Sequence, residues 1–294
     1  MFNYSEFLKE VIAEDNQKPV RHYSPLRWFG GKFYTADKII ALMPNHLCYA
    51  EPFFGAGHVF FKKPKAEVEV INDIDLSIYS FFKVLSNENL FNEFIKKVYL
   101  LYSHRKIFEE QGEVLRDKSA NIVDKAVAFF YRISLAFGAR VKNNSYVSGF
   151  SRNNAQSFNS AKRRLFFAHE RLRNVFVECK DWKEVVKQYD SDDTLLYCDP
   201  PYIHDTRKSK DDYEHEMTNE QHEELINILL SLKSKVILSG YANPIYERLE
   251  KNGWRRIDIE TYCWCYNAKD TNGVRDKRIE SLWLNYKPSQ AKLF

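Results

Sequence analysis

Leu47-Cys-Tyr-Ala-Glu-Pro-Phe-Phe-Gly-Ala-Gly57 is the stretch of sequence that decides the fold. Its apolar beginning predicts a short buried strand over residues 47–51, and its two glycines predict a turn before a helix over residues 58–62. Val68-Glu-Val-Ile-Asn-Asp73 then alternates apolar and polar residues and ends in acids, which predicts a second strand. An apolar series at helical spacing follows over residues 76–85. These segments predict the opening of a βαβ unit and hence an α/β protein with a Rossmann-like sheet.

The distance from the two glycines to Asp73 indicates a cofactor site. It is close to the roughly 20 residues that separate a cofactor turn from the carboxylate that binds ribose hydroxyls. The turn lacks the full three-glycine fingerprint and starts with Glu51-Pro52, so a pyrophosphate ligand is not favoured. A cofactor that carries a ribose and no phosphate suits this turn.

Further elements complete the predicted sheet. Strands are predicted over residues 194–198, 235–239, 254–259, 262–266 and 278–286. One helix is predicted to begin at the capping box Thr218-Asn-Glu-Gln221, and another to run from Asn243-Pro244 to Asn252-Gly253.

The alternation of strands and helices breaks in the middle of the chain. From about Asn87 to Arg173 the sequence is helical and rich in polar and basic residues. We therefore predict that residues 87–173 are an inserted, mainly helical domain, and that residues 20–86 and 174–294 form one catalytic domain.

Charge is concentrated in the predicted insertion. The net charge of the chain is +4, yet residues 125–175 contain ten basic residues and one acid, a net charge of +9. These cations are interleaved with phenylalanine and asparagine, whereas solvated helix faces normally mix both signs. A polyanionic partner is the preferred interpretation.

Composition sets wider bounds. With 294 residues, of which 44% are hydrophobic, the chain can bury a large core. No apolar run approaches the roughly 18 residues of a membrane span, and the first residues do not resemble a signal peptide, so we expect a cytoplasmic protein without membrane contact. The five cysteines are odd in number, which suits reduced thiols. Cys263-Trp-Cys265 offers only two ligands, so no metal is expected.

Tyr197-Cys-Asp-Pro-Pro-Tyr202 carries the predicted chemistry. Proline cannot donate to a sheet ladder, so this stretch marks the point where a strand leaves its sheet. The amino group of a nucleobase is a poor nucleophile because its lone pair is delocalised into the ring. If Asp199 and the carbonyl of Pro200 each accept a hydrogen bond from it, the lone pair is aimed at an electrophile while Tyr202 stacks on the base. A base in a duplex would have to be flipped out to reach such a site.

Three motifs together carry a family resemblance. Asp199-Pro-Pro-Tyr202, Glu51-Pro-Phe-Phe-Gly-Ala-Gly57 and Trp28-Phe-Gly-Gly-Lys32 resemble the motifs of the Dam-type DNA N6-adenine methyltransferases, the D12 class or alpha group. In that family the target-recognition domain lies between the glycine motif and Asp-Pro-Pro-Tyr, an order that matches the basic insertion here. The resemblance implies a Rossmann-like sheet with an inserted DNA-recognition domain. It also implies site-specific methyl transfer from S-adenosylmethionine to a flipped-out adenine in double-stranded DNA.

The resemblance implies roles for particular residues. The catalytic candidates are Asp199, Pro200, Pro201 and Tyr202. The cofactor-binding candidates are Trp28, Phe29, Gly30, Lys32, Glu51, Pro52, Phe53, Gly55, Gly57, Asp73 and Asp181. Among them, Lys32 is expected to meet the carboxylate of the methionine part, Asp73 the ribose, and the segment around Asp181 the adenine of the cofactor.

The DNA contacts are expected in the insertion, where Phe137-Gly-Ala-Arg140 and Ser148-Gly-Phe150 resemble the family's recognition hairpin. The DNA-binding candidates are Arg140, Lys142, Asn143, Asn144, Arg152 and Asn153. Arginine suits guanine and asparagine suits adenine, although we expect most of these side chains to bind phosphates. A cognate restriction endonuclease that acts on the same DNA site is a predicted partner.

Two other functions stay open at this level. One is a methyltransferase for another amino group, namely cytosine N4, RNA adenine or a protein glutamine. Aspartate at position 199 favours adenine, since related families often have serine or asparagine there, and the +9 insertion argues against a protein substrate. The other is a DNA-binding protein that keeps the fold without catalysis. Covalent attack by Cys198 is disfavoured, because the Pro-Cys order of cytosine-C5 enzymes is absent and thiols in apolar strands are usually inert.

Overall fold

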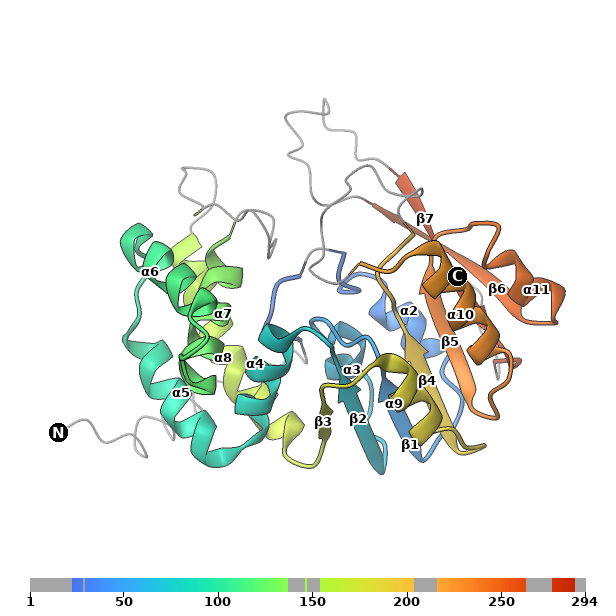
Figure 1. The fold of residues 1–294 in the computed structure, drawn as a ribbon, viewed down its shortest axis with the longest axis horizontal. Coiled ribbons are helices and arrows are strands. Elements are labelled where there is room, and N and C mark those ends of the chain that lie inside the picture. The colour runs from blue at the N-terminus through green and yellow to red at the C-terminus, as the bar shows by residue number, and fades with distance from the viewer. Residues whose placement is uncertain are drawn as a thin grey trace.

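The computed structural model describes residues 23–28, 30–136, 146, 154–203, 216–262 and 277–288, with the backbone alone at residues 154–156 and 262 (Figure 1). Its centre is a seven-stranded sheet in the order β3-β2-β1-β4-β5-β7-β6, in which the pairs among the first five strands are parallel. The antiparallel strand β7 pairs with both β5 and β6. The strands are β1 (Cys48–Glu51), β2 (Val68–Asn72), β3 (Phe176–Glu178), β4 (Thr194–Cys198), β5 (Lys235–Gly240), β6 (Arg255–Tyr262) and β7 (Lys277–Leu284). The predicted Rossmann-like α/β fold is confirmed.

The strand order reverses between β1 and β4. From β1 the chain continues outward to β2 and β3, whereas β4 and β5 extend the sheet in the other direction. In open α/β sheets such a reversal leaves a crevice at the carboxyl ends of the two central strands, where ligands bind. Glu51 ends β1 and Asp199 directly follows β4, so both residues lie at this crevice.

The central strands β1, β2, β4 and β5 are buried on both faces, which explains their apolar runs. Alternate residues of β4 serve different cores: Leu195 and Tyr197 belong to one, and Leu196 and Cys198 to the other. The first core includes side chains from α2 (Ala36–Ala41), α3 (His58–Lys62) and α4 (Leu76–Ser86). The second includes side chains from α9 (Trp182–Gln188), α10 (Asn219–Leu229) and α11 (Glu247–Lys251). In Figure 1, α9 and α10 lie on the near face of the sheet and α2 lies on the far face.

Four helices follow α4 and form a helical unit at one end of the molecule (Figure 1). They are α5 (Glu88–Leu100), α6 (Arg105–Arg116), α7 (Ile122–Leu135) and α8 (Asn154–Leu172). Two neighbouring rings of α4 join this unit to the sheet. The ring centroid of Phe81 lies 5.8 Å from that of Phe130 on α7, and the centroid of Phe82 lies 4.8 Å from that of Phe54 beside β1. One hydrophobic core therefore runs through both parts.

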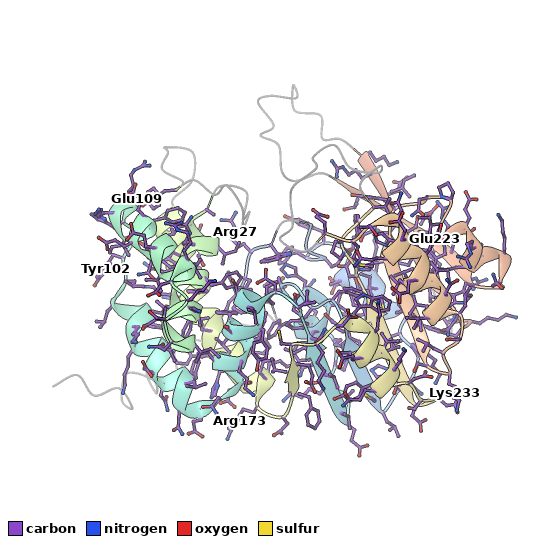
Figure 2. All side chains as sticks on the ribbon, in the orientation of Figure 1. Arg27, Tyr102, Glu109, Arg173, Glu223 and Lys233 are labelled. Atoms are coloured by element: carbon purple, nitrogen blue, oxygen red, sulfur yellow. The ribbon has the colours of Figure 1, made fainter. Side chains whose placement is uncertain are left out.

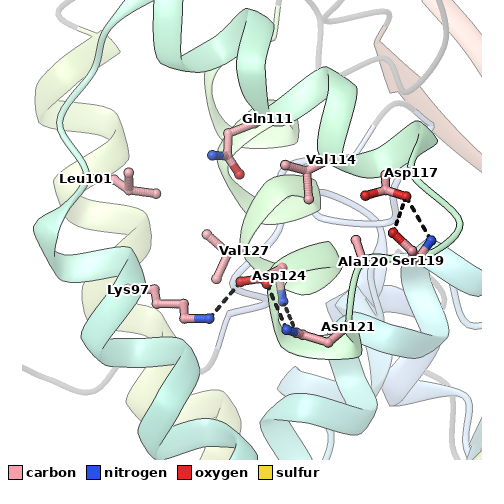
Figure 3. Close-up of a pocket in the computed structure, with 10 residues that line it drawn as sticks. All are labelled: Lys97, Leu101, Gln111, Val114, Asp117, Ser119, Ala120, Asn121, Asp124 and Val127. Atoms are coloured by element: carbon pink, nitrogen blue, oxygen red, sulfur yellow. Dashed lines mark hydrogen bonds and ion pairs between the residues drawn. The ribbon is translucent and has the colours of Figure 1, made fainter.

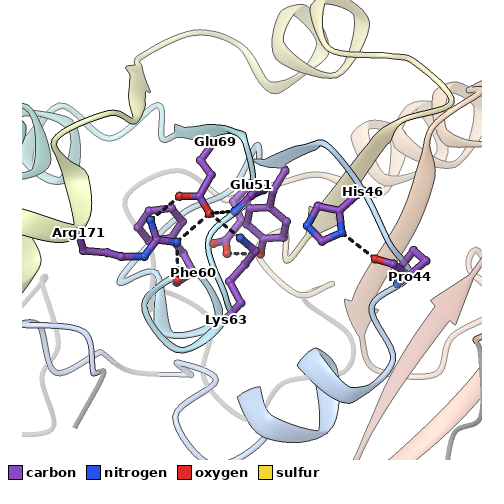
Figure 4. A network of polar contacts seen from close by, with 9 residues as sticks. Pro44, His46, Glu51, Phe60, Lys63, Glu69 and Arg171 are labelled. Carbon is purple, nitrogen blue, oxygen red and sulfur yellow. Dashed lines mark hydrogen bonds and ion pairs between the residues drawn. The ribbon is translucent and has the colours of Figure 1, made fainter. Parts of the chain in front are cut away.

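An ion-pair network ties the end of α8 to β2 (Figure 4). The carboxylate of Glu69 on β2 accepts a hydrogen bond from Lys63 at 2.5 Å and two from Arg171, one of them at 2.8 Å. The guanidinium of Arg171 also lies 3.9 Å from the ring centroid of Phe60. All three charged side chains are buried, so each charge depends on the others for compensation.

Most predicted elements are found close to their predicted bounds, two differ, and three observed elements were not predicted. The helix expected from Asn243-Pro244 is regular only from Glu247, and residues 244–246 form a turn before it. Asn243 still accepts a hydrogen bond from the backbone N–H of Tyr246, as the residue that caps a helix does. β6 continues to Tyr262, while residues 263–266 lie outside the described part of the chain. α2, β3 and α9 were not predicted. The split at residues 87 and 173 stays a prediction, and no helix in the described ranges is both long and apolar enough to cross a membrane.

Candidate active site

A cavity of about 410 Å³ lies at the carboxyl ends of β1, β2 and β4. All four catalytic candidates line it. So do ten of the eleven cofactor-binding candidates: Trp28, Gly30, Lys32, Glu51, Pro52, Phe53, Gly55, Gly57, Asp73 and Asp181. The remaining one, Phe29, lies outside the described residues. The fold thus gathers into one space residues that are up to 174 positions apart in the sequence.

Asp199 is held by a buried lysine. Both carboxylate oxygens of Asp199 accept hydrogen bonds from Nζ of Lys32, each at 2.7 Å. Lys32 also donates to the hydroxyl of Tyr202 at 2.7 Å, and its Nζ lies 3.0 Å from Oε1 of Glu280 on β7. The hydroxyl of Tyr202 donates to the same oxygen of Glu280 at 2.5 Å. We call these four side chains the Lys32 network.

The charges of the Lys32 network shift its pKa values. Burial disfavours the charged form of Lys32, yet Asp199 and Glu280 more than offset this, so its pKa lies above the ordinary value. Burial raises the pKa of Asp199 to about 6, with Glu280 adding to the rise and Lys32 opposing it. Lys32 was expected to meet the methionine carboxylate, and the structure places its ammonium between two carboxylates of the protein instead. Its contact with the cofactor stays a prediction.

Two further carboxylates line the cavity on the β1 and β2 side. Glu51 is buried and accepts a hydrogen bond from the hydroxyl of Tyr49, and burial raises the pKa of Glu51 to about 8. Asp73 accepts hydrogen bonds from the backbone N–H of Gly55 at 2.8 Å and of Asp75 at 2.9 Å. Burial and the neighbouring charge of Asp75 raise the pKa of Asp73 to about 7. A cationic ligand next to these acids would lower both pKa values and favour the carboxylate forms.

The turn between β1 and α3 depends on its glycines. Gly55 has a φ of 52° and Gly57 a φ of 65°. Residues other than glycine rarely adopt this backbone conformation. A Cβ atom at Gly57 would lie 2.2 Å from the ring of Phe54, a core residue. The backbone of this turn is therefore left open toward the cavity.

Asn72 joins three loops around the cavity. Its Nδ2 donates to the carbonyls of Pro52 at 2.9 Å and Lys180 at 3.1 Å, and its Oδ1 accepts from the backbone N–H of Lys180 at 2.9 Å. The loops after β1, β2 and β3 are thereby fixed relative to one another. The next residues, Asp181 and Trp182, begin α9, with Asp181 as the N-cap. The ring centroid of Trp182 lies 5.8 Å from that of Phe53 on the opposite loop.

The basic run is only partly a surface. Lys162 is buried and donates to the carbonyl of Leu101 at 2.6 Å, and burial lowers its pKa to about 8. Arg171 is buried against Glu69, so the interpretation of the whole run as a polyanion surface is wrong for these two residues. Arg173 is exposed, but it lies just before β3, at the edge opposite the cavity (Figure 2). The DNA-binding candidates Arg140, Lys142, Asn143, Asn144, Arg152 and Asn153 lie outside the residues whose side chains are described.

Sequence reasoning missed Glu280 and the role of Asn72. Glu280 shares a face of β7 with Leu282 and Leu284, both of which belong to the apolar core. An acid on the apolar face of a strand is a signal for a buried partner, and this signal was present in the sequence. Asn72 carried no such signal, because its three partners are set by the packing of loops.

A second cavity of about 480 Å³ lies in the helical unit, between α5, α6 and α7 (Figure 3). None of the predicted site residues lines it. Its two acids are already engaged: Asp124 pairs with Lys97 at 2.7 Å and Asp117 accepts from Ser119. Within the described ranges, the chain places no group of three or more His, Cys, Asp or Glu residues that could hold a metal ion.

Comparison with known proteins agrees with this geometry. Residues 28–261 match the family model of the D12 class N6 adenine-specific DNA methyltransferases. A DNA adenine methylase of Escherichia coli (strain K12) is 25% identical over 280 residues, which cover 90% of this chain and 95% of the relative. A DNA adenine methylase of Salmonella typhi is 23% identical over 283 residues, covering 90% and 96%. One of Haemophilus influenzae is 27% identical over 197 residues, covering 62% and 65%. Because the family model spans most of the chain, including the glycine turn and Asp-Pro-Pro-Tyr, the chain belongs to the D12 class of N6 adenine-specific DNA methyltransferases.

Proposed function

We propose that this protein methylates the N6 amino group of adenine in double-stranded DNA, with S-adenosylmethionine as the methyl donor. One observation carries the proposal. The glycine turn after β1 and Asp199-Pro-Pro-Tyr202 after β4 follow neighbouring strands and line the same cavity. A methyl donor held by the turn and an amine held by Asp199 would therefore meet in one space.

The residues around the turn fit S-adenosylmethionine. When bound, this cofactor supplies a methyl group that its sulfonium makes electrophilic. Its positive charges suit a cavity lined by Glu51, Asp73 and Asp181, and it needs no phosphate cradle. Asp73, held in place by two backbone N–H groups, keeps lone pairs for ribose hydroxyls. Phe53 and Trp182 offer aromatic faces to its adenine.

Asp199 would prepare the nucleophile. We propose that its carboxylate and the carbonyl of Pro200 accept the two hydrogen bonds of the N6 amino group. Both groups can act only as acceptors while Asp199 is ionised, so they draw the amine out of conjugation and orient its lone pair. Direct displacement then needs no protein nucleophile, and the rate derives from alignment and electrostatics.

Tyr202 would hold the target base. Its hydroxyl is fixed between Lys32 and Glu280, and its ring packs edge-on against Tyr241 with centroids 4.7 Å apart. These contacts set the orientation of the ring before any substrate arrives. We propose that a flipped-out adenine stacks on it.

The helical unit would bring DNA to this site. We propose residues 87–173 as the DNA-recognition domain, with Arg140, Lys142, Asn143, Asn144, Arg152 and Asn153 as contacts. Arg140→Ala should weaken DNA binding with a shallower salt dependence if Arg140 meets a phosphate, or relax site choice if it meets a base. Unchanged binding and unchanged site choice would place Arg140 outside the interface. A restriction endonuclease that cuts the same site would be the matching partner.

The reaction is tested with methyl-labelled S-adenosylmethionine and unmethylated duplex DNA, which is then digested to nucleosides. We expect the label in N6-methyladenine, and we expect Asp199→Ala to abolish it while DNA binding persists. Label in N4-methylcytosine would show that the substrate base is cytosine. If neither nucleoside carries the label, the proposal is overturned.

A further inference from the structure

We propose that Glu280 is a positioning residue for methyl transfer. It holds Lys32 and Tyr202 in place, and its negative charge offsets the positive charge of Lys32. The Asp199 carboxylate can then still attract the substrate amine and accept its hydrogen bond. The inference rests on the proposed function. It assigns a role to a side chain of β7, in the far, antiparallel part of the sheet. No described residue of β5, β6 or β7 lines the cavity, so Glu280 acts on the site through Lys32 and Tyr202, which do line it.

The position of Glu280 calls for an explanation. It lies on β7, on the same face as the core residues Leu282 and Leu284, and it is only 7% exposed. A buried carboxylate is strongly destabilising unless charged or donor groups compensate it. Glu280 has two such partners, Nζ of Lys32 at 3.0 Å and the hydroxyl of Tyr202 at 2.5 Å. Lys32 also contacts Asp199, and Tyr202 ends the motif that Asp199 begins.

Hydrogen-bond geometry gives Glu280 a holding role. Lys32 donates to both oxygens of Asp199, so in this arrangement its ammonium takes up the acceptor atoms that the substrate amine must reach. An ammonium has three protons, and Glu280 and Tyr202 provide two acceptors apart from Asp199. Glu280 therefore lets Lys32 stay fully bonded while Asp199 accepts a hydrogen bond from the amine.

Charge gives Glu280 a second role. During transfer the C–S bond breaks as the N–C bond forms, so positive charge moves from sulfur to N6. S-adenosylhomocysteine is released, and N6 then loses one proton to water to give N6-methyladenine. Lys32 and Asp199 alone sum to zero charge beside that nitrogen. With Glu280 ionised, the three side chains sum to −1. Because Lys32 and Glu280 are buried and Asp199 is largely so, this charge is less screened by water and salt than a surface charge would be.

The test is the single-turnover rate of methyl transfer at saturating S-adenosylmethionine and DNA. Glu280→Gln keeps the shape and an acceptor oxygen but removes the charge, and we expect the rate to fall about tenfold to a hundredfold. The KM for DNA should change little. Glu260→Gln is the matched control: Glu260 lies on the adjacent strand, 61% exposed and paired with Lys277 at 2.5 Å. We expect wild-type rates from this control.

A double variant separates charge from packing. Lys32→Met combined with Glu280→Gln restores a net charge of −1 when Asp199 is ionised. At a pH on the plateau of both rate profiles it should therefore be several-fold faster than Glu280→Gln alone. If Glu280 matters only for packing, the double variant should be slower than Glu280→Gln, because the second substitution would lower the rate further. Saturation with cofactor is checked by titration for every variant, and the thermal midpoint shows that each is folded.

The pH profile provides a further readout. Several titratable groups surround Asp199. They are Lys32 on the loop before α2, Glu280 on β7, Tyr202 on the same loop as Asp199, Tyr197 on β4 and Glu51 on β1. Removing the negative charge of Glu280 stabilises ionised Asp199, so the acid limb of the rate profile should move to lower pH. An unmoved limb together with a wild-type rate in Glu280→Gln would overturn this inference alone. A wild-type protein that methylates no adenine would overturn the proposed function as well.

Discussion

The proposed role of Asp199 depends on its protonation state. Burial raises its pKa to about 6, with Glu280 adding to the rise and Lys32 opposing it. The carboxylate accepts hydrogen bonds from an amine, whereas the protonated acid would present a donor. Because the carboxylate takes up its proton as the pH falls through this pKa, the single-turnover rate should fall about tenfold per pH unit below about pH 6.

Asp199→Asn checks this assignment, because the amide does not titrate. We expect the acid limb to vanish and the rate to be low at every pH, measured from about pH 5 to about pH 8. A limb that persists in this variant would mean that another group, such as Asp73, controls the rate.

Asn72 stabilises the site through three hydrogen bonds to neighbouring loops. Asn72→Ala leaves the carbonyls of Pro52 and Lys180 and one N–H without this partner, so the free energy of unfolding should fall by roughly 2 kcal/mol. The affinity for the cofactor should fall too, because these loops form two sides of the cavity. Urea unfolding and calorimetric titration measure the two effects. The control is Asn252→Ala, an exposed asparagine that donates to the carbonyl of Arg248, for which we expect a change within about 0.5 kcal/mol.

At the scale of elements, the glycine turn allows strain and steric clash to be separated. Gly57 and Gly253 both have positive φ values, 65° and 85°. A Cβ at Gly57 would meet the ring of Phe54 at 2.2 Å, whereas at Gly253 it would meet nothing within 4 Å. Gly253→Ala should therefore lower the free energy of unfolding by about 1 kcal/mol, from backbone strain alone.

Gly57→Ala should be destabilising by at least roughly twice that amount, because the ring or the turn must move as well. It should also weaken cofactor binding, which Gly253→Ala should leave intact. Equal losses of stability in the two variants would show that the ring of Phe54 yields without penalty.

Elements with local signals could be predicted from the sequence, and elements made by long-range pairing could not. The capping box of α10, in which Thr218 and Gln221 bond reciprocally, was found from the spacing of two residues. β3 was missed, since its three residues owe their conformation to pairing with β2, more than 100 positions away. The same holds for the site. The motifs predicted which loops meet, but Lys32 and Asp199 are 167 residues apart, and Glu280 reaches them only because β7 pairs with β5.

At the scale of the whole molecule, the buried pair of Glu69 and Arg171 fastens the helical unit to the sheet. Glu69→Gln would leave two buried cations, Lys63 and Arg171, without the carboxylate that compensates their charges. We expect the free energy of unfolding to fall by about 3–5 kcal/mol, measured by urea denaturation. The control is Glu93→Gln, which breaks an exposed pair with Lys97 on α5 and should change stability by less than about 0.5 kcal/mol.

The shared rings of α4 bear on how this enzyme can be recombined with its relatives. Phe81 packs on the helical unit and Phe82 on the β1 turn, so α4 has complementary surfaces on both sides. A chimaera that imports a foreign segment in place of residues 87–173, the proposed recognition domain, would inherit mismatched aromatic contacts along this helix. Specificity is therefore not freely portable in this architecture, and a graft should carry α4 with its donor or redesign Phe81 to suit the new partner.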